Sequence, residues 1–176
     1  YRVTMEPTQR EWLFALNVSY ANPNTALGLT RDYTLQSREP IRLRQDFRFF
    51  QYRQAVLDTV LSDELRQVNL QLPRDSNPQS QAFAQALLRQ TNGDPDLYMQ
   101  AILAWIRQQN FVYTLQPPRL AGQRIDQFLF ETRRGFCEHY SSAFTFLMRS
   151  AGIPARVVVG YQGGQLGRDG ESWEVR

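Results

Sequence analysis

The chain has 176 residues, of which 42% are hydrophobic and 12% aromatic, with a formal net charge of +3. This composition is typical of one folded domain or two small ones and excludes a disordered chain. No apolar run is long enough to span a bilayer, and no signal peptide opens the sequence. Since Tyr1 is not a natural initiator, we expect the chain to be a piece of a longer protein.

All 20 basic residues are arginine, and they are interleaved with 17 acidic residues. We interpret them as a solvated surface rather than a nucleic-acid-binding patch. One cysteine and one histidine exclude an internal disulfide and argue against a structural zinc site. The sequence also has no carboxylate cluster of the kind that binds calcium, so we expect no cofactor and no metal.

Residues 1–72 are expected to form a small, sandwich-like β subdomain. Side chains alternate in character over residues 12–20 and again over residues 41–49, and a period of two is typical of strands with one buried face. In the first run the set that begins with Trp12, Phe14 and Leu16 is expected to be buried. Residues 33–35 indicate another strand, and Asn22-Pro23-Asn24 indicates a turn.

Residues 73–80 are expected to be a linker and residues 81–176 a second domain. Asn77 and Pro78 are typical of the start of a helix, which Gly93 ends. Asp94 and Pro95 repeat the start signal. The helix that follows is predicted from an apolar stripe at helical spacing, made of Leu97, Ala101, Ile102, Trp105 and Ile106. Core packing is the expected role of Trp105.

Further elements are expected along the second domain. Phe111–Leu115 reads as a short extended piece, and Asp126 is more consistent with a helix cap than with a catalytic acid. An amphipathic helix begins at Cys137 and ends at Gly152-Ile153-Pro154. Val157–Val159 is expected to be a buried strand. Trp173–Val175 is expected to be another strand of the same sheet.

Cys137 is the one cysteine of the chain, and it lies where a catalytic nucleophile would lie. Gly135 interrupts the backbone, and the helix starts at the thiol. A helix N-terminus presents unpaired N–H groups and a partial positive charge, and both favour the reactive thiolate form. Arg133 and Arg134 either add positive potential there or form a solvated pair. The alternative role for Cys137 is a buried structural cysteine.

An oxyanion intermediate at Cys137 needs hydrogen-bond donors. The backbone N–H of Cys137 itself is the natural first donor. Tyr113 is a candidate for the second, and its alternative role is a packed tyrosine. His139 follows Cys137 by two residues, which turns its side chain by about 200° around the helix axis. We therefore reject His139 as the general base and interpret it as a solvent or interface histidine.

Two sequence blocks about fifteen residues apart carry a family resemblance. The first is Gly135-Phe136-Cys137, preceded by Asp126 and Phe128-Leu129, and the second runs from Arg149 through Gly152-Ile153-Pro154 to Tyr161. Together they resemble the transglutaminase-like superfamily of papain-type cysteine acyltransferases and proteases. The resemblance implies an α+β, papain- and transglutaminase-like core, in which the cysteine helix packs on an antiparallel sheet that is incomplete here.

The resemblance also implies a Cys–His–Asp triad with Cys137 as nucleophile. In the family, the histidine opens the strand after the Gly-Tyr strand and its loop, and the aspartate lies on the next strand. The sequence reaches Arg176 before either residue. We therefore expect a piece that is inactive by itself and belongs to an active, cysteine-dependent acyltransferase.

The sequence resembles in particular the TgpA-type transglutaminases of the bacterial inner membrane, whose domain lies in the periplasm. This implies a periplasmic protein-glutamine gamma-glutamyltransferase with a membrane-anchored parent. Its partners would be a protein or peptide glutamine donor and an amine acceptor. A cysteine protease or amide hydrolase and a non-catalytic envelope-binding module remain alternatives. Without lysine, the chain offers no side-chain amine for self-crosslinking and is expected to stay monomeric.

Overall fold

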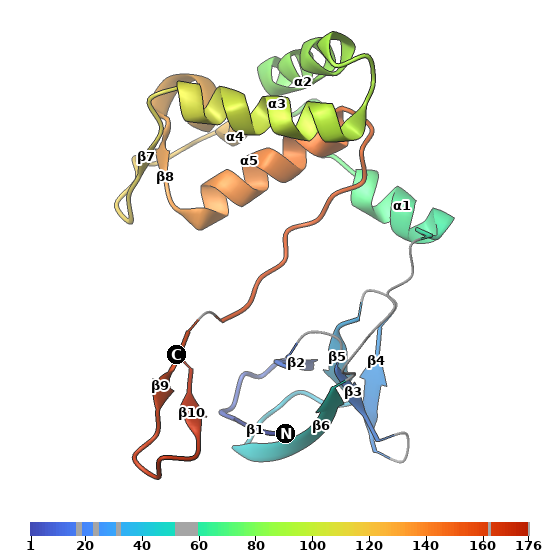
Figure 1. Cartoon of the computed structure of the whole chain (residues 1–176), viewed down its shortest axis with the longest axis vertical. Coiled ribbons are helices and arrows are strands. Elements are labelled where there is room, and N and C mark those ends of the chain that lie inside the picture. Colours follow the sequence, from blue (N-terminus) through green and yellow to red (C-terminus); the bar gives the residue numbers. More distant parts are fainter. Residues whose placement is uncertain (17–18, 23–24, 31–32, 52–59, 162, 176) are drawn as a thin grey trace. The chain divides into compact units, whose positions relative to one another are not determined.

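The computed structural model describes residues 1–16, 19–22, 25–30, 33–51, 60–161 and 163–175 (Figure 1). The chain divides into two compact units, one made of Tyr1–Thr59 with Gly160–Arg176 and the other of Val60–Val159. A β-rich unit and a helical unit that carries the cysteine helix confirm the expected α+β class. The boundaries of 1–72, 73–80 and 81–176 for subdomain, linker and core stay a prediction.

The first unit contains two three-stranded antiparallel sheets. One has the order β1-β6-β3, formed by Arg2–Met5, Gln45–Gln51 and Ser19–Ala21. The other has the order β2-β5-β4, formed by Trp12–Leu13, Leu35–Ser37 and Leu27–Leu29. Both sheets contribute to one core cluster, made of Met5, Leu13, Leu35, Ile41, Phe47 and Phe49. The expectation of a small β subdomain is confirmed.

The prediction that Trp12, Phe14 and Leu16 form a buried face is wrong. Trp12, Phe14 and Leu16 are exposed, whereas Leu13 is buried. The alternation assumed one continuous strand, but β2 ends after Leu13, so the period of two does not continue from it. Asn17 and Val18 lie outside the described residues, as do Pro23 and Asn24 of the expected turn.

Two other strand expectations need correction. Tyr33 is exposed and has a φ of 62°, and its N–H donates to the carbonyl of Thr30, so it forms a turn before β5. The expected strand over residues 41–49 begins only at Gln45. Ile41 is nevertheless fully buried as expected, while Leu43 is exposed. Burial of Ile41 therefore comes from a loop that folds over the sheets.

Val157–Val159 is not the expected buried strand. All three side chains are exposed, and the segment has no strand partner among the described residues. Trp173–Glu174 does form a strand, β10, but it pairs with β9, Gln165–Leu166, in a hairpin. Trp173 lies opposite Leu166. The apolar character of the three valines predicted a buried strand, which needs a covering layer that the described residues do not provide.

The second unit is mainly helical (Figure 1). Its elements are α1 Asp63–Leu70, α2 Pro78–Gln90, α3 Pro95–Gln108, β7 Val112–Tyr113, α4 Arg124–Asp126, the π-helix η1 Gln127–Thr132, β8 Arg134–Gly135 and α5 Cys137–Ser150. Helix α1 falls within residues expected to be β structure. Ser62 accepts a hydrogen bond from the N–H of Leu65 and so begins α1, a cap signal that the strand interpretation missed.

The starts of α2 and α3 lie where the sequence predicts them. Asp94 accepts hydrogen bonds from the N–H groups of Asp96 and Leu97 at 2.9 and 3.0 Å. The buried stripe of α3 begins one position later than predicted, because Leu97 is exposed and Tyr98 is fully buried. Tyr98 and Ile102 are separated by four residues, so they lie one turn apart on the same face.

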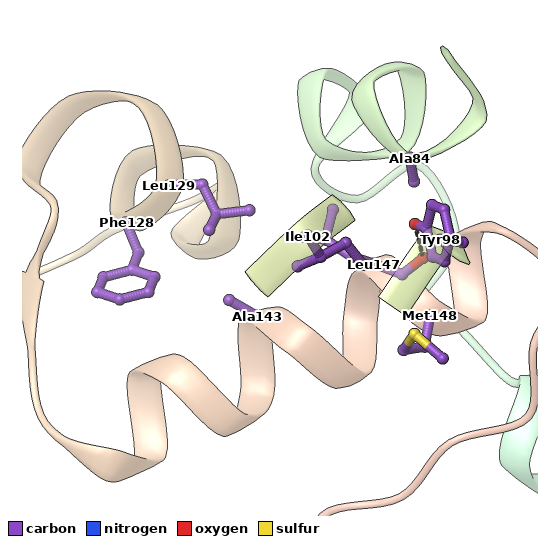
Figure 2. Close-up of a cluster of buried hydrophobic side chains, with 8 residues drawn as sticks. All are labelled: Ala84, Tyr98, Ile102, Phe128, Leu129, Ala143, Leu147 and Met148. Atoms are coloured by element: carbon purple, nitrogen blue, oxygen red, sulfur yellow. Dashed lines mark hydrogen bonds between the residues drawn. The ribbon is translucent and has the colours of Figure 1, made fainter. Parts of the chain in front are cut away.

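The core of the second unit lies between α2, α3, η1 and α5 (Figure 2). It is made of Ala84, Tyr98, Ile102, Phe128, Leu129, Ala143, Leu147 and Met148. Trp105 packs against this cluster as expected. Its ring centroid lies 4.7 Å from that of Phe83 and 5.7 Å from that of Phe111. The core thereby fixes α5 against α2 and α3.

One buried polar contact crosses this core. The hydroxyl of Tyr98 donates to the carbonyl oxygen of Leu147 at 2.8 Å (Figure 2). This bond joins α3 to α5, and burial raises the pKa of the Tyr98 phenol above its ordinary value. The folded state therefore favours the neutral phenol, since a buried phenolate would lose its hydration.

Tyr98→Phe is expected to lower the free energy of unfolding at pH 7 by about 1 kcal/mol, the net value of one such hydrogen bond. Because the folded-state pKa is raised, the wild type loses stability as the pH rises above the ordinary tyrosine value of about 10. Tyr98→Phe has no phenol at this position, so its free energy of unfolding should not show this decrease at high pH. Urea unfolding at pH 7 and pH 11 checks both effects, with the exposed Tyr161→Phe as control. Equal pH dependence in Tyr98→Phe and wild type would contradict the assignment.

Candidate functional site

Helix α5 begins at Cys137, as the sequence predicts, and the thiol is exposed. Phe136 precedes it in an extended conformation, and its carbonyl accepts hydrogen bonds from the N–H groups of His139 and Tyr140. Helix geometry leaves the N–H groups of Cys137 and Glu138 without a partner inside the helix. Exposure excludes the alternative role of a buried structural cysteine.

The residues before Cys137 are held by a short parallel ladder between β7 and β8 (Figure 1). The N–H of Val112 donates to the carbonyl of Arg133 at 2.8 Å, and the N–H of Thr114 donates to that of Gly135 at 2.8 Å. The expected extended piece at residues 111–115 is therefore confirmed over β7. It fixes the path of the chain into α5.

Gly135 is required by close packing. A Cβ atom at this position would lie 2.7 Å from Cβ and Cγ of His139 and 2.9 Å from Cε2 of Phe128. The sequence suggests a backbone break, but Gly135 is not among the glycines with positive φ. It lies in β8 and allows the imidazole and the phenyl ring to contact the strand.

The side chain of His139 caps the start of α5. The backbone N–H of Phe136 donates to its Nδ1 at 3.4 Å, and its ring meets that of Phe136 edge to face at a centroid distance of 4.6 Å. The side chain is half-buried rather than a free surface group. Its imidazole accepts a hydrogen bond from the residue before the helix, as the third residue of a capping box does.

Tyr113 and Tyr140 form an aromatic pair beside the thiol. Their ring centroids lie 6.2 Å apart with an interplanar angle of 20°. Tyr140 follows Cys137 by three residues, so the two side chains lie on neighbouring positions of one helix face. Tyr113 is 62% exposed, which distinguishes it from a packed core tyrosine. Burial, with a smaller contribution from Tyr113, raises the pKa of Tyr140 above its ordinary value, so its phenol is neutral at pH 7.

The two arginines before the cysteine differ in role. Arg133 has a φ of 50° and ends η1. Its N–H donates to the carbonyl of Phe128, and its Nε donates to the carbonyl of Leu129 at 3.4 Å. Arg134 is exposed on β8. They are therefore not a solvated pair, because Arg133 serves as a helix cap.

Asp126 is a cap, as expected, but of another helix. Its buried carboxylate accepts hydrogen bonds from the N–H groups of Gln79 and Ser80 at 3.1 and 2.7 Å, and from the Ser80 hydroxyl. In return, Oδ1 of Asn77 accepts from the N–H groups of Ile125 and Asp126 at 2.9 and 3.3 Å. Each side chain caps the helix that begins near the other. All of these bonds are internal to the fold, which leaves this carboxylate no evident catalytic part.

The second sequence block builds the other end of α5. The N–H groups of Gly152 and Ile153 donate to the carbonyls of Arg149 and Met148, and Gly152 has a φ of 77°, which together form a Schellman motif. Arg149 donates from Nε to the carbonyl of Ala155 at 2.7 Å and from Nη1 to that of Gln71 at 2.9 Å. It ties the chain after α5 to the end of α1.

The described residues contain neither a metal-binding cluster nor a helix suited to cross a bilayer. No group of three or more histidine, cysteine, aspartate or glutamate side chains is placed to hold a metal ion there. Among the helices of the same residues, none combines the length and apolar character that crossing a bilayer requires.

Sequence reasoning missed two features of the site. The stacking of Tyr140 on Tyr113 joins residues 27 positions apart, although the three-residue spacing from Cys137 would have placed Tyr140 beside the thiol. The contact of Gly135 with His139 and Phe128 cannot be recognised from the neighbouring sequence, because β8, α5 and η1 meet only after folding.

Comparison with family models gives one match. The model described as the transglutaminase-like superfamily matches residues 81–175. The curated relatives include a protein-glutamine gamma-glutamyltransferase of Pseudomonas aeruginosa, 43% identical over 166 residues, which cover 94% of this chain and 25% of the relative. The uncharacterized protein YebA of Bacillus subtilis is 31% identical over 151 residues, which cover 82% of this chain and 20% of that protein. The chain thus spans about a quarter or less of these relatives.

Solved structures also match this chain. Two crystal structures of the periplasmic domain of TgpA from Pseudomonas aeruginosa, one of them bound to ethylmercury, superpose with a TM-score of 0.89 and 41% identity. The match covers 99% of this chain, 62% of the ethylmercury-bound chain and 60% of the other.

Gly135→Ala is expected to destabilise the second unit by about 1–3 kcal/mol, because the added methyl group overpacks against His139 and Phe128. The start of α5 should shift, which changes the alkylation rate of Cys137 by iodoacetamide. Thermal unfolding and alkylation kinetics check the two effects. Gly28→Ala is the matched control, since a Cβ there meets open space on a strand. Unchanged stability and alkylation in Gly135→Ala would contradict the packing argument.

Proposed function

This chain belongs to the transglutaminase-like superfamily, and we propose that it carries the nucleophile of a protein-glutamine gamma-glutamyltransferase. The observation that supports this most strongly is the exposed Cys137 at the first position of α5. The 43% identity to the Pseudomonas aeruginosa enzyme supports the activity. The likeness to the periplasmic domain of TgpA supports a periplasmic location in a membrane-anchored parent.

The reaction begins with attack of the Cys137 thiolate on the carboxamide carbon of a protein or peptide glutamine. The C–S bond forms and the C–N bond breaks. The proton that the general base took from the thiol passes to the leaving nitrogen, so ammonia departs and a thioester remains. A primary amine then attacks the thioester, forms the new amide and releases the thiol. The thioester, from which a thiolate leaves readily in the second step, divides one difficult amide exchange into two easier steps.

The negative oxygen that develops in each step requires fixed donors. We assign the backbone N–H of Cys137 as the first donor, because helix geometry leaves it unpaired. The phenol of Tyr113 is proposed as the second. Its exposure and its position across from Gly135, two residues before the nucleophile, support this role.

The reaction also requires a general base and a residue that orients it. His139 is not proposed for the base, because its Nδ1 accepts the N–H of Phe136 and it follows the nucleophile by two residues on the same helix. We propose that the base histidine and its aspartate lie outside residues 1–176. The solved relatives, of which this chain covers 62% or less, support a larger complete domain.

Cys137→Ala in the full-length protein is expected to lower transfer of a labelled primary amine onto a glutamine protein by about 10³-fold or more. Mass spectrometry of the glutamine separates transfer from hydrolysis to glutamate. His139→Asn is the control, because its amide oxygen can still accept from Phe136, and it should keep most of the activity. Full activity in Cys137→Ala would refute the nucleophile, and loss in His139→Asn equal to that in Cys137→Ala would refute the assignment of His139.

Tyr113→Phe is expected to lower kcat by about 10²-fold with little change in KM, since removing one oxyanion donor costs mainly transition-state stabilisation. Tyr140→Phe keeps the stacked ring and serves as the control, with an expected effect of less than about threefold, the order of a weak hydrogen bond. Steady-state kinetics with one glutamine peptide checks both. Equal effects of the two changes would contradict the specific role of the Tyr113 hydroxyl.

A further inference from the structure

Hydrogen bonds hold both peptide groups that flank Phe136. In the peptide before it, the carbonyl of Gly135 accepts from the N–H of Thr114 at 2.8 Å. The N–H of the same peptide, which belongs to Phe136, donates to Nδ1 of His139 at 3.4 Å. In the peptide after it, the carbonyl of Phe136 accepts from the N–H of His139 at 2.9 Å. His139 therefore binds Phe136 twice, once through its imidazole and once through its backbone.

These bonds set the direction of the Cys137 N–H. The C=O and N–H of a planar trans peptide point in opposite directions. The carbonyl of Phe136 points into the first turn of α5, where it accepts from the helix, so the N–H of Cys137 points away from that turn. Phe136 is extended, with a φ of −119° and a ψ of −174°. Only these two dihedrals separate its two peptides, so a hold on both peptides fixes where the Cys137 N–H points.

The imidazole that accepts this bond is itself held by its neighbours. Its ring centroid lies 4.6 Å from that of Phe136 and 5.6 Å from that of Phe128. The backbone of Gly135 passes so close that a Cβ there would lie 2.7 Å from Cγ of His139. These contacts limit rotation of the ring and keep Nδ1 directed at the N–H of Phe136.

We propose that His139 is a positioning residue for acyl transfer, whose imidazole holds Phe136 so that the N–H of Cys137 stays directed at the oxygen that becomes negative. The inference rests on the proposed function, in which this N–H is the first oxyanion donor. A donor fixed before the reaction costs no reorganisation when the charge develops. Without the imidazole acceptor, the half-buried N–H of Phe136 loses its partner, and the peptide before Phe136 keeps only its bond to Thr114.

Two reactions of the same thiol separate positioning from a purely structural role. Alkylation by iodoacetamide forms a C–S bond and expels iodide, without a negative oxygen. Acylation by p-nitrophenyl acetate forms a C–S bond, passes through a negative oxygen and releases p-nitrophenolate. A side chain that only stabilises α5 affects both reactions alike. The ratio of the acylation rate to the alkylation rate therefore reports how the oxyanion donor is oriented.

The matched variants are His139→Leu and His139→Asn in the full-length protein. Both side chains branch at Cγ, but only asparagine has an acceptor there, since its Oδ1 takes the place of Nδ1. His139→Leu is expected to lower the acylation rate constant at least about tenfold, part of the roughly 10²- to 10³-fold cost of losing one oxyanion donor, and to change alkylation less than about threefold. His139→Asn is expected to keep acylation within about threefold of the wild type, because the acceptor is restored. The rate of Cys137→Ala is subtracted as background.

Hydrogen–deuterium exchange at the Phe136 amide tests the bond itself and needs no turnover. Exchange is expected to be at least about fivefold faster in His139→Leu than in the wild type and in His139→Asn, because only leucine removes the acceptor. Thermal unfolding shows whether each variant is folded at the assay temperature. If His139→Leu is not, His139→Ala takes its place, since alanine also lacks the acceptor and favours a helix more strongly.

Three results overturn the proposal. They are Phe136 exchange that His139→Leu leaves unchanged, equal loss of acylation and alkylation in that variant, and equal loss of acylation in His139→Leu and His139→Asn. Any of these with a wild type that transfers an amine refutes the role of His139 but not the acyltransferase. The expected pattern in a wild type that transfers no amine supports the role of His139 and refutes the acyltransferase. A wild type that is not acylated at Cys137 refutes both.

Discussion

The close contact of β8 with the first turn of α5 is the constraint on which the site depends. Gly135 lies so near His139 and Phe128 that no side chain fits between them. The strand, η1 and the helix start are therefore packed as one piece. Because β7 pairs with β8, the backbone of Tyr113 is held at a fixed position relative to the start of α5.

The two ends of α5 explain why the family resemblance falls into two blocks. Gly135-Phe136-Cys137 builds the N-terminus, where helix geometry leaves the first N–H groups without a partner inside the helix. At the C-terminus, Arg149 donates to carbonyl groups of the chain that follows and of the end of α1, and the N–H of Gly152 donates to the carbonyl of Arg149. Between them, Ala143 and Leu147 lie in the core (Figure 2). Both blocks position one helix, and its first residue is Cys137, the proposed nucleophile.

Several polar side chains of the second unit form hydrogen bonds with backbone groups far away in the sequence. Asn77 and Asp126 cap each other's helices, and Tyr98 joins α3 to α5. The exposed groups near the start of α5 include the Cys137 thiol and the Tyr113 phenol.

Local chemistry allowed much of the helical unit to be predicted from the sequence. Proline, capping aspartate and left-handed glycine act within a few residues, so the start of α3, the limits of α5 and the exposed role of Cys137 at a helix start followed from the printed residues alone. What required the tertiary structure was every property that depends on a distant neighbour. Alternation at Trp12 and the apolar run at Val157 indicate burial only if a covering layer is present. The partners of Asp126, His139 and Tyr113 are 3 to 47 residues away, and only folding brings the more distant ones together.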